Sequence, residues 1–118
     1  MYHCHVDTDH HVDMGMYGAM IVDPKVEEDY QFDKEIVWVL SSFNTMPHKH
    51  MTTMNSPYFS GHQQYSSEYD AYLINGKAFP ATTPLEVNEG DTVKMRMINI
   101  GKEPYSIHIH GHSFKVTH

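Results

Sequence analysis

The stretch YHCHVDTDHHVDMGMYGAMIV, residues 2–22, decides how the rest of this 118-residue chain is interpreted. It contains the single cysteine of the sequence, Cys4, with histidines on both sides of it and methionines soon after. Thiolate and thioether sulfur favour Cu(I), and imidazole binds both oxidation states of copper. These donor types, crowded into so few residues, therefore predict a copper site.

Alternation along an extended chain would divide the donors between two metal centres. If Tyr2–Val6 is a strand, His3 and His5 point to one face and Cys4 points to the other. One centre would take the thiolate and a second would take the two imidazoles. A few covalent bonds through the backbone would join the two centres, which is a short path for an electron.

The polar residues Asp7–Asp9 are expected to form a loop that returns later donors to Cys4. Gly15 gives the backbone the freedom to turn there. Two ligand sets satisfy the sequence: Cys4, His11 and Met16, or Cys4, His10 and Met14.

The segments that follow predict short strands separated by turns. Tyr17–Val22 is a short apolar run, and Glu35–Ser42 is a longer apolar run of the kind found in strands that are covered on both faces. Tyr69–Ile74 has strand character, and the Asn75–Gly76 pair after it is a strong hairpin signal. Thr92–Ile100 alternates with period two, as a half-buried strand does.

A second group of histidines lies in YSIHIHGHSF, Tyr105–Phe114. On a strand, His108 and His110 would share one face while Ile107 and Ile109 enter the apolar interior. Two imidazoles held on one face of a sheet form a preorganised pair of metal ligands.

Methionines and histidines also gather in MPHKHMTTM, residues 46–54. Soft thioethers and imidazoles there are consistent with a surface site for Cu(I), and an exposed methionine-rich loop without a ligand is the alternative. A long polar loop is expected to follow, over residues 55–67.

Composition excludes several classes of partner. The formal net charge of −7 argues against nucleic acid and against anionic membranes. One cysteine excludes an intrachain disulfide. The sequence shows neither a signal peptide nor an apolar run long enough to span a bilayer.

Three stretches resemble multicopper oxidases. Residues 2–22 are similar to the C-terminal copper motif of that family, HIHGHSF at 108–114 is similar to its HxHGHxF motif, and YLINGKAFPATTPLEVNEGDTVKMRMINIG at 72–101 resembles the strands between such motifs. The resemblance implies type 1 copper ligands at Cys4, His11 and Met16, type 3 ligands at His3 and His5, and type 2 and type 3 ligands at His108 and His110. His112 would hold a neighbouring ligand by a hydrogen bond.

The resemblance also implies the fold. We expect an all-β, cupredoxin-like Greek-key β-sandwich that is incomplete in this chain, preceded by the last strand of another cupredoxin domain. Residues 1–22 would be the C-terminal end of a first domain with the type 1 and type 3 motif. Residues 23–34 would be a linker, and residues 35–118 the N-terminal part of a second, plastocyanin-like domain. The chain is accordingly expected to be a fragment of a longer protein.

The implied function is a laccase-like, two-domain multicopper oxidase that couples one-electron oxidation of a donor to the reduction of O2 to water. The donor would be a small molecule or a metal ion, the full protein a homotrimer, and the compartment periplasmic or extracellular. Related domains with type 1 copper carry a histidine three positions before the His-x-His pair, where this sequence has Tyr105. The type 1 site is therefore expected in the first domain only, and this chain alone is expected to be inactive.

The same residues distinguish three other possible functions. A copper nitrite reductase would not need the type 3 pair to which His5 belongs. A non-catalytic blue-copper electron-transfer or copper-binding module would not need the pair at His108 and His110. A cupin metalloenzyme also places a His-x-His pair on a strand, but it requires a glutamate soon afterwards, and none follows His110.

Overall fold

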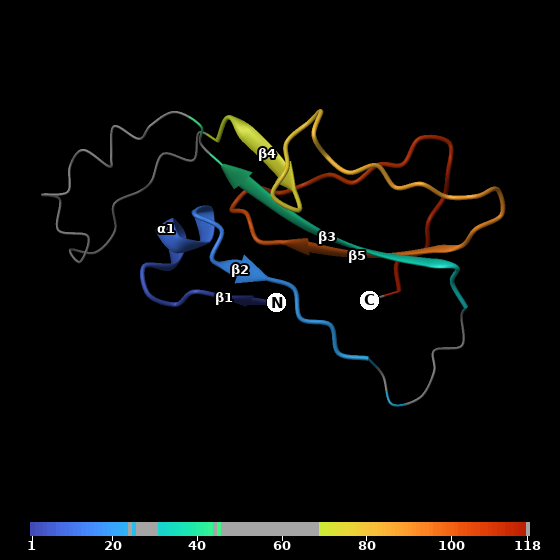
Figure 1. The fold of residues 1–118 in the computed structure, drawn as a ribbon, viewed down its shortest axis with the longest axis horizontal. Coiled ribbons are helices and arrows are strands. Elements are labelled where there is room, and N and C mark those ends of the chain that lie inside the picture. Colours follow the sequence, from blue (N-terminus) through green and yellow to red (C-terminus); the bar gives the residue numbers. More distant parts are fainter. Residues whose placement is uncertain (24, 26–30, 44, 46–68, 118) are drawn as a thin grey trace, which may run out of the picture.

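The computed structural model describes residues 1–23, 25, 31–43, 45 and 69–117 (Figure 1). Its elements, in chain order, are β1 (Tyr2–His3), α1 (Thr8–Asp13), β2 (Tyr17–Gly18), β3 (Lys34–Phe43), β4 (Ala71–Ile74) and β5 (Val93–Asn99). Apart from one six-residue helix, the regular structure described is made of strands. The all-β class expected from the sequence is therefore confirmed.

β3 is the middle strand of a three-stranded sheet in the order β4-β3-β5. It runs antiparallel to β4, with Leu40 opposite Ile74, and parallel to β5, with Trp38 beside Met97. Because β3 has a neighbouring strand on each side, backbone groups along both of its edges form hydrogen bonds. The strand expected at Glu35–Ser42 is confirmed and is one residue longer at each end.

Alternation gives the sheet two faces of different character. The Trp38 face carries the apolar side chains of β3 and their neighbours, namely Ile36, Trp38, Leu40, Ile74, Met95 and Met97, and ends at Ser42 and Tyr72. The Ser41 face is more polar: Arg96 pairs with Glu35, and the Lys94 ammonium lies 5.0 Å from the centre of the Phe32 ring. Opposite charges on neighbouring strands hold the exposed end of this face together.

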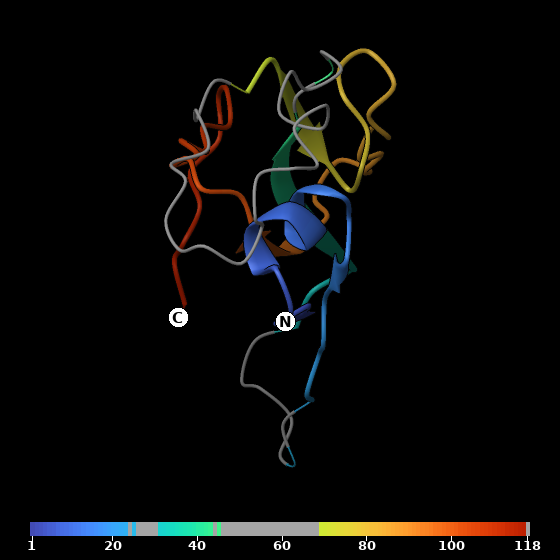
Figure 2. The same ribbon diagram turned by 90° about the vertical axis from the view of Figure 1, so that its left-hand side faces the viewer.

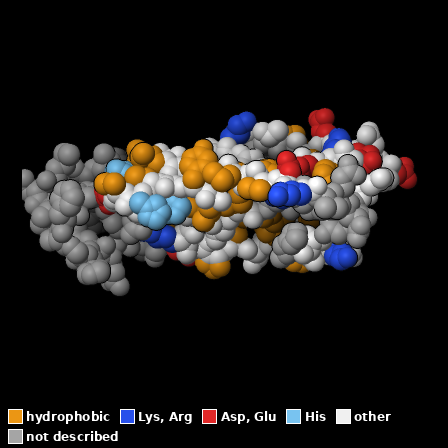
Figure 3. Space-filling view, turned by 90° about the horizontal axis from the view of Figure 1, so that it is seen from below, with side chains coloured by type: hydrophobic (Ala, Val, Ile, Leu, Met, Phe, Trp, Pro, Cys, Tyr) orange, Lys and Arg blue, Asp and Glu red, His pale blue; other side chains and the backbone are white. Residues whose placement is uncertain are grey.

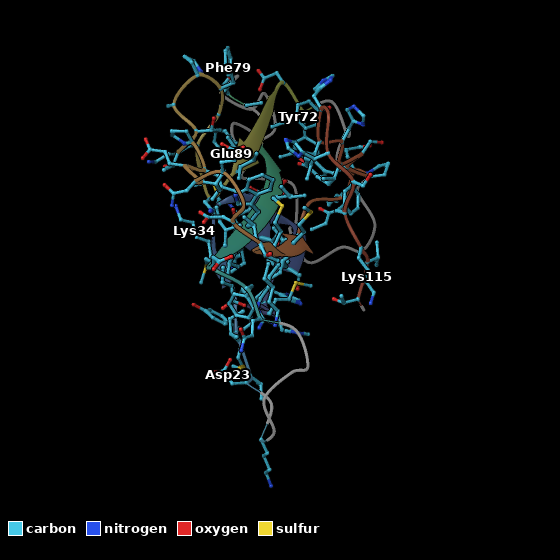
Figure 4. The ribbon with its side chains drawn as sticks, turned by 90° about the vertical axis from the view of Figure 1, so that its right-hand side faces the viewer. Asp23, Lys34, Tyr72, Phe79, Glu89 and Lys115 are labelled. Atoms are coloured by element: carbon cyan, nitrogen blue, oxygen red, sulfur yellow. The ribbon has the colours of Figure 1, made fainter. Side chains whose placement is uncertain are left out.

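The buried interior is small. Among the described residues, Leu40 is the only buried hydrophobic side chain, and it is 4% exposed. Large apolar groups stay in contact with solvent, including Phe79, which projects from its loop away from the sheet (Figure 4). On the Trp38 face, Tyr72 is 56% and Met97 is 38% exposed.

The first residues form a separate small unit, β1-α1-β2. β1 and β2 are antiparallel, with Tyr2 opposite Gly18 and His3 opposite Tyr17. The ring of Tyr2 lies directly over Gly18, where a Cβ atom would be only 2.3 Å from the tyrosine oxygen. The close approach therefore requires glycine. α1 contacts β3, so this unit lies against the end of the sheet (Figure 2).

Two expectations for this unit were wrong. The loop expected at Asp7–Asp9 is instead the start of α1, which begins at Thr8. Acidic residues favour a helix N-terminus, and Gly15, at φ 90°, supplies the left-handed residue that commonly follows a helix C-terminus. The strands expected at Tyr2–Val6 and Tyr17–Val22 have only two residues each, Tyr2–His3 and Tyr17–Gly18.

The strand expected at Tyr105–Phe114 is not part of a described ladder. Exposure nevertheless alternates residue by residue from 101 to 110, as in an extended chain. The segments at 46–54 and 55–67, and half of the expected linker, lie outside the described residues. The division into two domains stays a prediction. Within the described ranges, no helix has both the length and the apolar character needed to cross a membrane.

The hairpin after β4 is fixed by one side chain. Asn75 and Gly76 both have positive φ, at 52° and 76°, as the expected two-residue turn requires. The Asn75 side chain accepts a hydrogen bond from the Val39 N–H at 2.8 Å and donates one to the Val37 carbonyl at 3.0 Å. The turn is thereby attached to the middle strand.

Replacing this side chain tests the attachment. Asn75→Gly keeps the positive φ but removes both side-chain hydrogen bonds, so the free energy of unfolding should fall by about 1–2 kcal/mol. Asn75→Asp keeps the acceptor and loses the donor, so its loss should lie between those of the native protein and Asn75→Gly. Urea unfolding measures both. Equal stability of all three proteins would contradict the role assigned to Asn75.

Candidate metal centre

Cys4 and His11 come together at the start of the chain. The Cys4 Sγ atom lies 3.1 Å from His11 Nδ1, near Val6, whose N–H donates to the sulfur at 3.4 Å. The thiol in turn reaches the Val6 carbonyl at 3.2 Å. An imidazole nitrogen and a sulfur that face each other at this distance are two donors within reach of one metal ion.

Backbone hydrogen bonds bring Met16 to the same place. The Cys4 N–H donates to the Met16 carbonyl at 3.1 Å, and the Met16 N–H donates to the His11 carbonyl at 2.9 Å. The three residues predicted from the resemblance are thus joined through the backbone in one short loop. The Met16 side chain is 52% exposed, so its placement comes from the backbone rather than from packing.

His3 and His5 lie on one side of Cys4. Their rings are stacked, with centroids 4.6 Å apart and planes inclined by 18°. His3 Nδ1 is 3.0 Å from the Cys4 carbonyl, which can only accept a hydrogen bond, so Nδ1 donates this bond. Although β1 ends at His3, the alternation predicted for this tripeptide persists.

The C-terminal pair has the same spacing. The rings of His108 and His110 lie 4.6 Å apart at 87°, and both residues are exposed. Ile107 and Ile109 between and before them are half-buried. The two imidazoles therefore share the solvent side of an extended segment.

The two histidine pairs lie apart. In Figures 1 and 2 the blue N-terminal unit and the red segment after residue 105 occupy different parts of the molecule. Within the part of the chain that the structure describes, no three His, Cys, Asp or Glu side chains form a group able to hold a metal ion. Each pair offers fewer donors than a metal centre takes.

A small cavity of about 220 Å³ adjoins His3. It lies between α1 and the turn after β5, and its lining residues are His3, Thr8, Val12, Asp13, Ile100 and Lys102. Asp13 accepts a hydrogen bond from the Tyr69 hydroxyl at 3.0 Å. Sequence reasoning did not single out Asp13 or Lys102, because neither belongs to a motif with fixed spacing. Figure 3 shows pale-blue histidine side chains beside hydrophobic ones at this end of the molecule.

Burial changes the pKa of one tyrosine, Tyr105, which precedes the pair His108 and His110 in the chain. Burial raises the pKa of Tyr105 above its ordinary value of 10.0, while the hydrogen bond to Ser42 lowers it in part. Tyr72, Tyr17 and Glu103 add a repulsion that disfavours the phenolate. The hydroxyl is therefore held in its neutral, proton-donating form.

Residues 43–118 match the multicopper oxidase family. The chain belongs to the multicopper oxidase family. A protein of Kuenenia stuttgartiensis, named "Probable nitrite reductase-hydroxylamine oxidoreductase fusion protein", is 30% identical over 98 residues, which cover 83% of this chain. The aligned part spans 10% of the length of that relative. No solved structure matches the chain.

Family membership fixes the fold and the metal in general terms. The described strands belong to a cupredoxin-like β fold, and the family consists of copper-dependent oxidoreductases. The donors fit copper: a cysteine sulfur faces an imidazole at one place, and imidazoles stand in pairs at two others. The individual ligands stay predictions.

Substitution separates the two ligand sets left open by the sequence. Because the Cys4 sulfur faces His11, His11→Ala should abolish the visible thiolate-to-copper absorption band of the copper-loaded protein. His10→Ala, a matched loss of the neighbouring imidazole on α1, should keep it. Loss of the band in His10→Ala alone would reverse the assignment.

Alkaline titration tests the environment of Tyr105. Its raised pKa means that the folded state disfavours the phenolate, so the stabilisation is complete below pH 10 and is lost as the pH rises through the folded pKa. The free energy of unfolding should fall less steeply above pH 10 in Tyr105→Phe than in the native protein. Tyr72→Phe controls for the loss of a neighbouring hydroxyl, and identical slopes in the native and Tyr105→Phe proteins would contradict the expectation.

Proposed function

We propose that this chain is part of a laccase-like multicopper oxidase, which oxidises a donor in one-electron steps and reduces O2 to water. One observation supports this most directly: the Cys4 sulfur is directed to His11 on α1, while the flanking His3 and His5 rings stack together. Cys4, His11 and Met16 would hold a type 1 copper, and His3 and His5 would serve type 3 copper. Bound copper would supply the one-electron chemistry.

The protein groups around Cys4 have defined tasks in this proposal. The Val6 N–H donates to the sulfur and helps to hold it beside His11. The Cys4 carbonyl accepts a hydrogen bond from His3 Nδ1 and so orients the ring. The peptide between Cys4 and its neighbours is the electron path, and it needs no side-chain movement.

The cluster that reduces O2 would be assembled between copies of the protein. The described donors form pairs that lie apart, and the second set, His108 and His110, is exposed. Histidines from other parts of the protein would complete each pair. The protein would be a homotrimer, and its electron donor would be a small molecule or a metal ion. By family resemblance we place the protein in the periplasm or outside the cell.

A copper nitrite reductase is the second candidate. It is favoured by the name of the Kuenenia stuttgartiensis relative, which includes nitrite reductase. Such an enzyme would reduce nitrite and would leave His5 without a copper partner. The stacked His3 and His5 rings favour the oxidase.

Spectra and turnover of the copper-loaded protein test the proposal. The full-length, copper-loaded protein of which this chain is part should show a thiolate-to-copper band and consume O2 with a phenolic or metal-ion donor. Cys4→Ser should lose the band and the activity together, because the sulfur is both ligand and path. His108→Ala should lose O2 consumption and keep the band.

Three outcomes would decide against the oxidase. A band that survives Cys4→Ser would exclude Cys4 as ligand. O2 consumption that survives His108→Ala would exclude the second pair from the cluster. Nitrite reduction without O2 consumption, retained in His5→Ala, would select the nitrite reductase.

A further inference from the structure

The most buried polar residues described are two adjacent serines of β3. Ser41 is 5% and Ser42 is 3% exposed. Neighbours on a strand point to opposite faces, so one hydroxyl lies on each side of the sheet. A buried hydroxyl without a hydrogen-bond partner is costly, and each of these serines meets a tyrosine.

Tyr17 reaches Ser41 from the N-terminal unit. Its hydroxyl donates to Ser41 Oγ at 2.9 Å. Tyr17 is the β2 partner of His3 and directly follows Met16. One hydrogen bond to the sheet therefore acts on β2, which pairs with His3 and directly follows Met16.

Tyr105 reaches Ser42 from the other face. Its hydroxyl donates to Ser42 Oγ at 3.3 Å, and its ring meets Tyr72 edge-on with centroids 6.0 Å apart. A Cβ on Gly101 would lie 2.9 Å from Ser42 Oγ and 3.3 Å from the Tyr105 oxygen, so only glycine leaves room for this contact. Tyr105 precedes His108 by three residues in the same extended segment.

We propose that Ser41 and Ser42 are positioning residues that set the two histidine motifs independently, Ser41 through Tyr17 and Ser42 through Tyr105. The inference rests on the proposed function for the identity of the metal. Its geometric part concerns the placement of His3 and His108 and holds without a metal. The two hydrogen bonds align the candidate metal ligands, and the serines themselves do not contact copper.

Two phenylalanine variants test the proposal. Tyr17→Phe should shift the thiolate-to-copper band and weaken copper binding at that site roughly tenfold, the lower end for groups that orient ligands. It should leave unchanged the EPR signal of copper held by His108 and His110. Tyr105→Phe should do the reverse. Tyr72→Phe, which removes an exposed hydroxyl beside the same contact, should change neither signal.

Double variants show whether each tyrosine acts through its own serine. Tyr17→Phe combined with Ser41→Ala should shift the thiolate band no further than Tyr17→Phe alone, because both remove one bond. Tyr105→Phe combined with Ser42→Ala should likewise match Tyr105→Phe at the second site. Tyr17→Phe with Ser42→Ala should show both changes. Full additivity within the Tyr17–Ser41 pair would overturn the proposal.

A metal-free measurement separates this inference from the proposed function. In NMR spectra of the apo-protein, Tyr17→Phe should move the imidazole signals of His3 and His5, and Tyr105→Phe those of His108 and His110. Equal stability losses without these selective changes would reduce the bonds to ordinary structural contacts and overturn the inference. A native protein that lacks the thiolate band but shows the selective NMR changes would refute only the proposed copper chemistry.

Discussion

The hydrogen-bonding position of β3 is the constraint on which the described structure depends. Its backbone pairs with β4 on one side and β5 on the other, and Asn75 adds two bonds from the turn. Its side chains at Ser41 and Ser42 then receive bonds from segments on opposite faces. A long apolar strand in the middle position is the element best able to do this, because it can be covered on both sides.

Local patterns predicted the parts whose partners are near in sequence. The run at β3 and the Asn75–Gly76 turn carry their own signals, namely apolar β-branched residues and a pair that tolerates positive φ. The approach of His11 to Cys4 also spans only a few residues. The prediction was wrong about the segment that brings His11 back to Cys4, which is the helix α1 and not a loop. Gly15, which follows the end of that helix, was interpreted as part of a flexible turn.

Longer contacts had no signal in the sequence. Nothing in the spacing of Tyr17 or Tyr105 indicates a serine of β3, because a tyrosine hydroxyl can bond to any acceptor that the fold brings near. The same holds for Asp13 and Lys102 beside His3, which lie together only because α1 meets the turn after β5. Motifs with fixed spacing identify candidate ligands, whereas the groups that orient them depend on the tertiary structure.

The Trp38 face of the sheet is partly exposed to solvent. Parallel strands such as β3 and β5 are normally covered on both faces, yet Met97 and Tyr72 on this side keep much of their surface in solvent. A sandwich domain covers such a face with a second sheet about 10 Å away. The Tyr105 segment lies on this side through Ser42, whereas the Cys4 unit is attached through Ser41 to the other face. Since adjacent residues of one strand hold the two motifs on opposite faces, the sheet itself stands between them, and further donors must reach each pair from its own side.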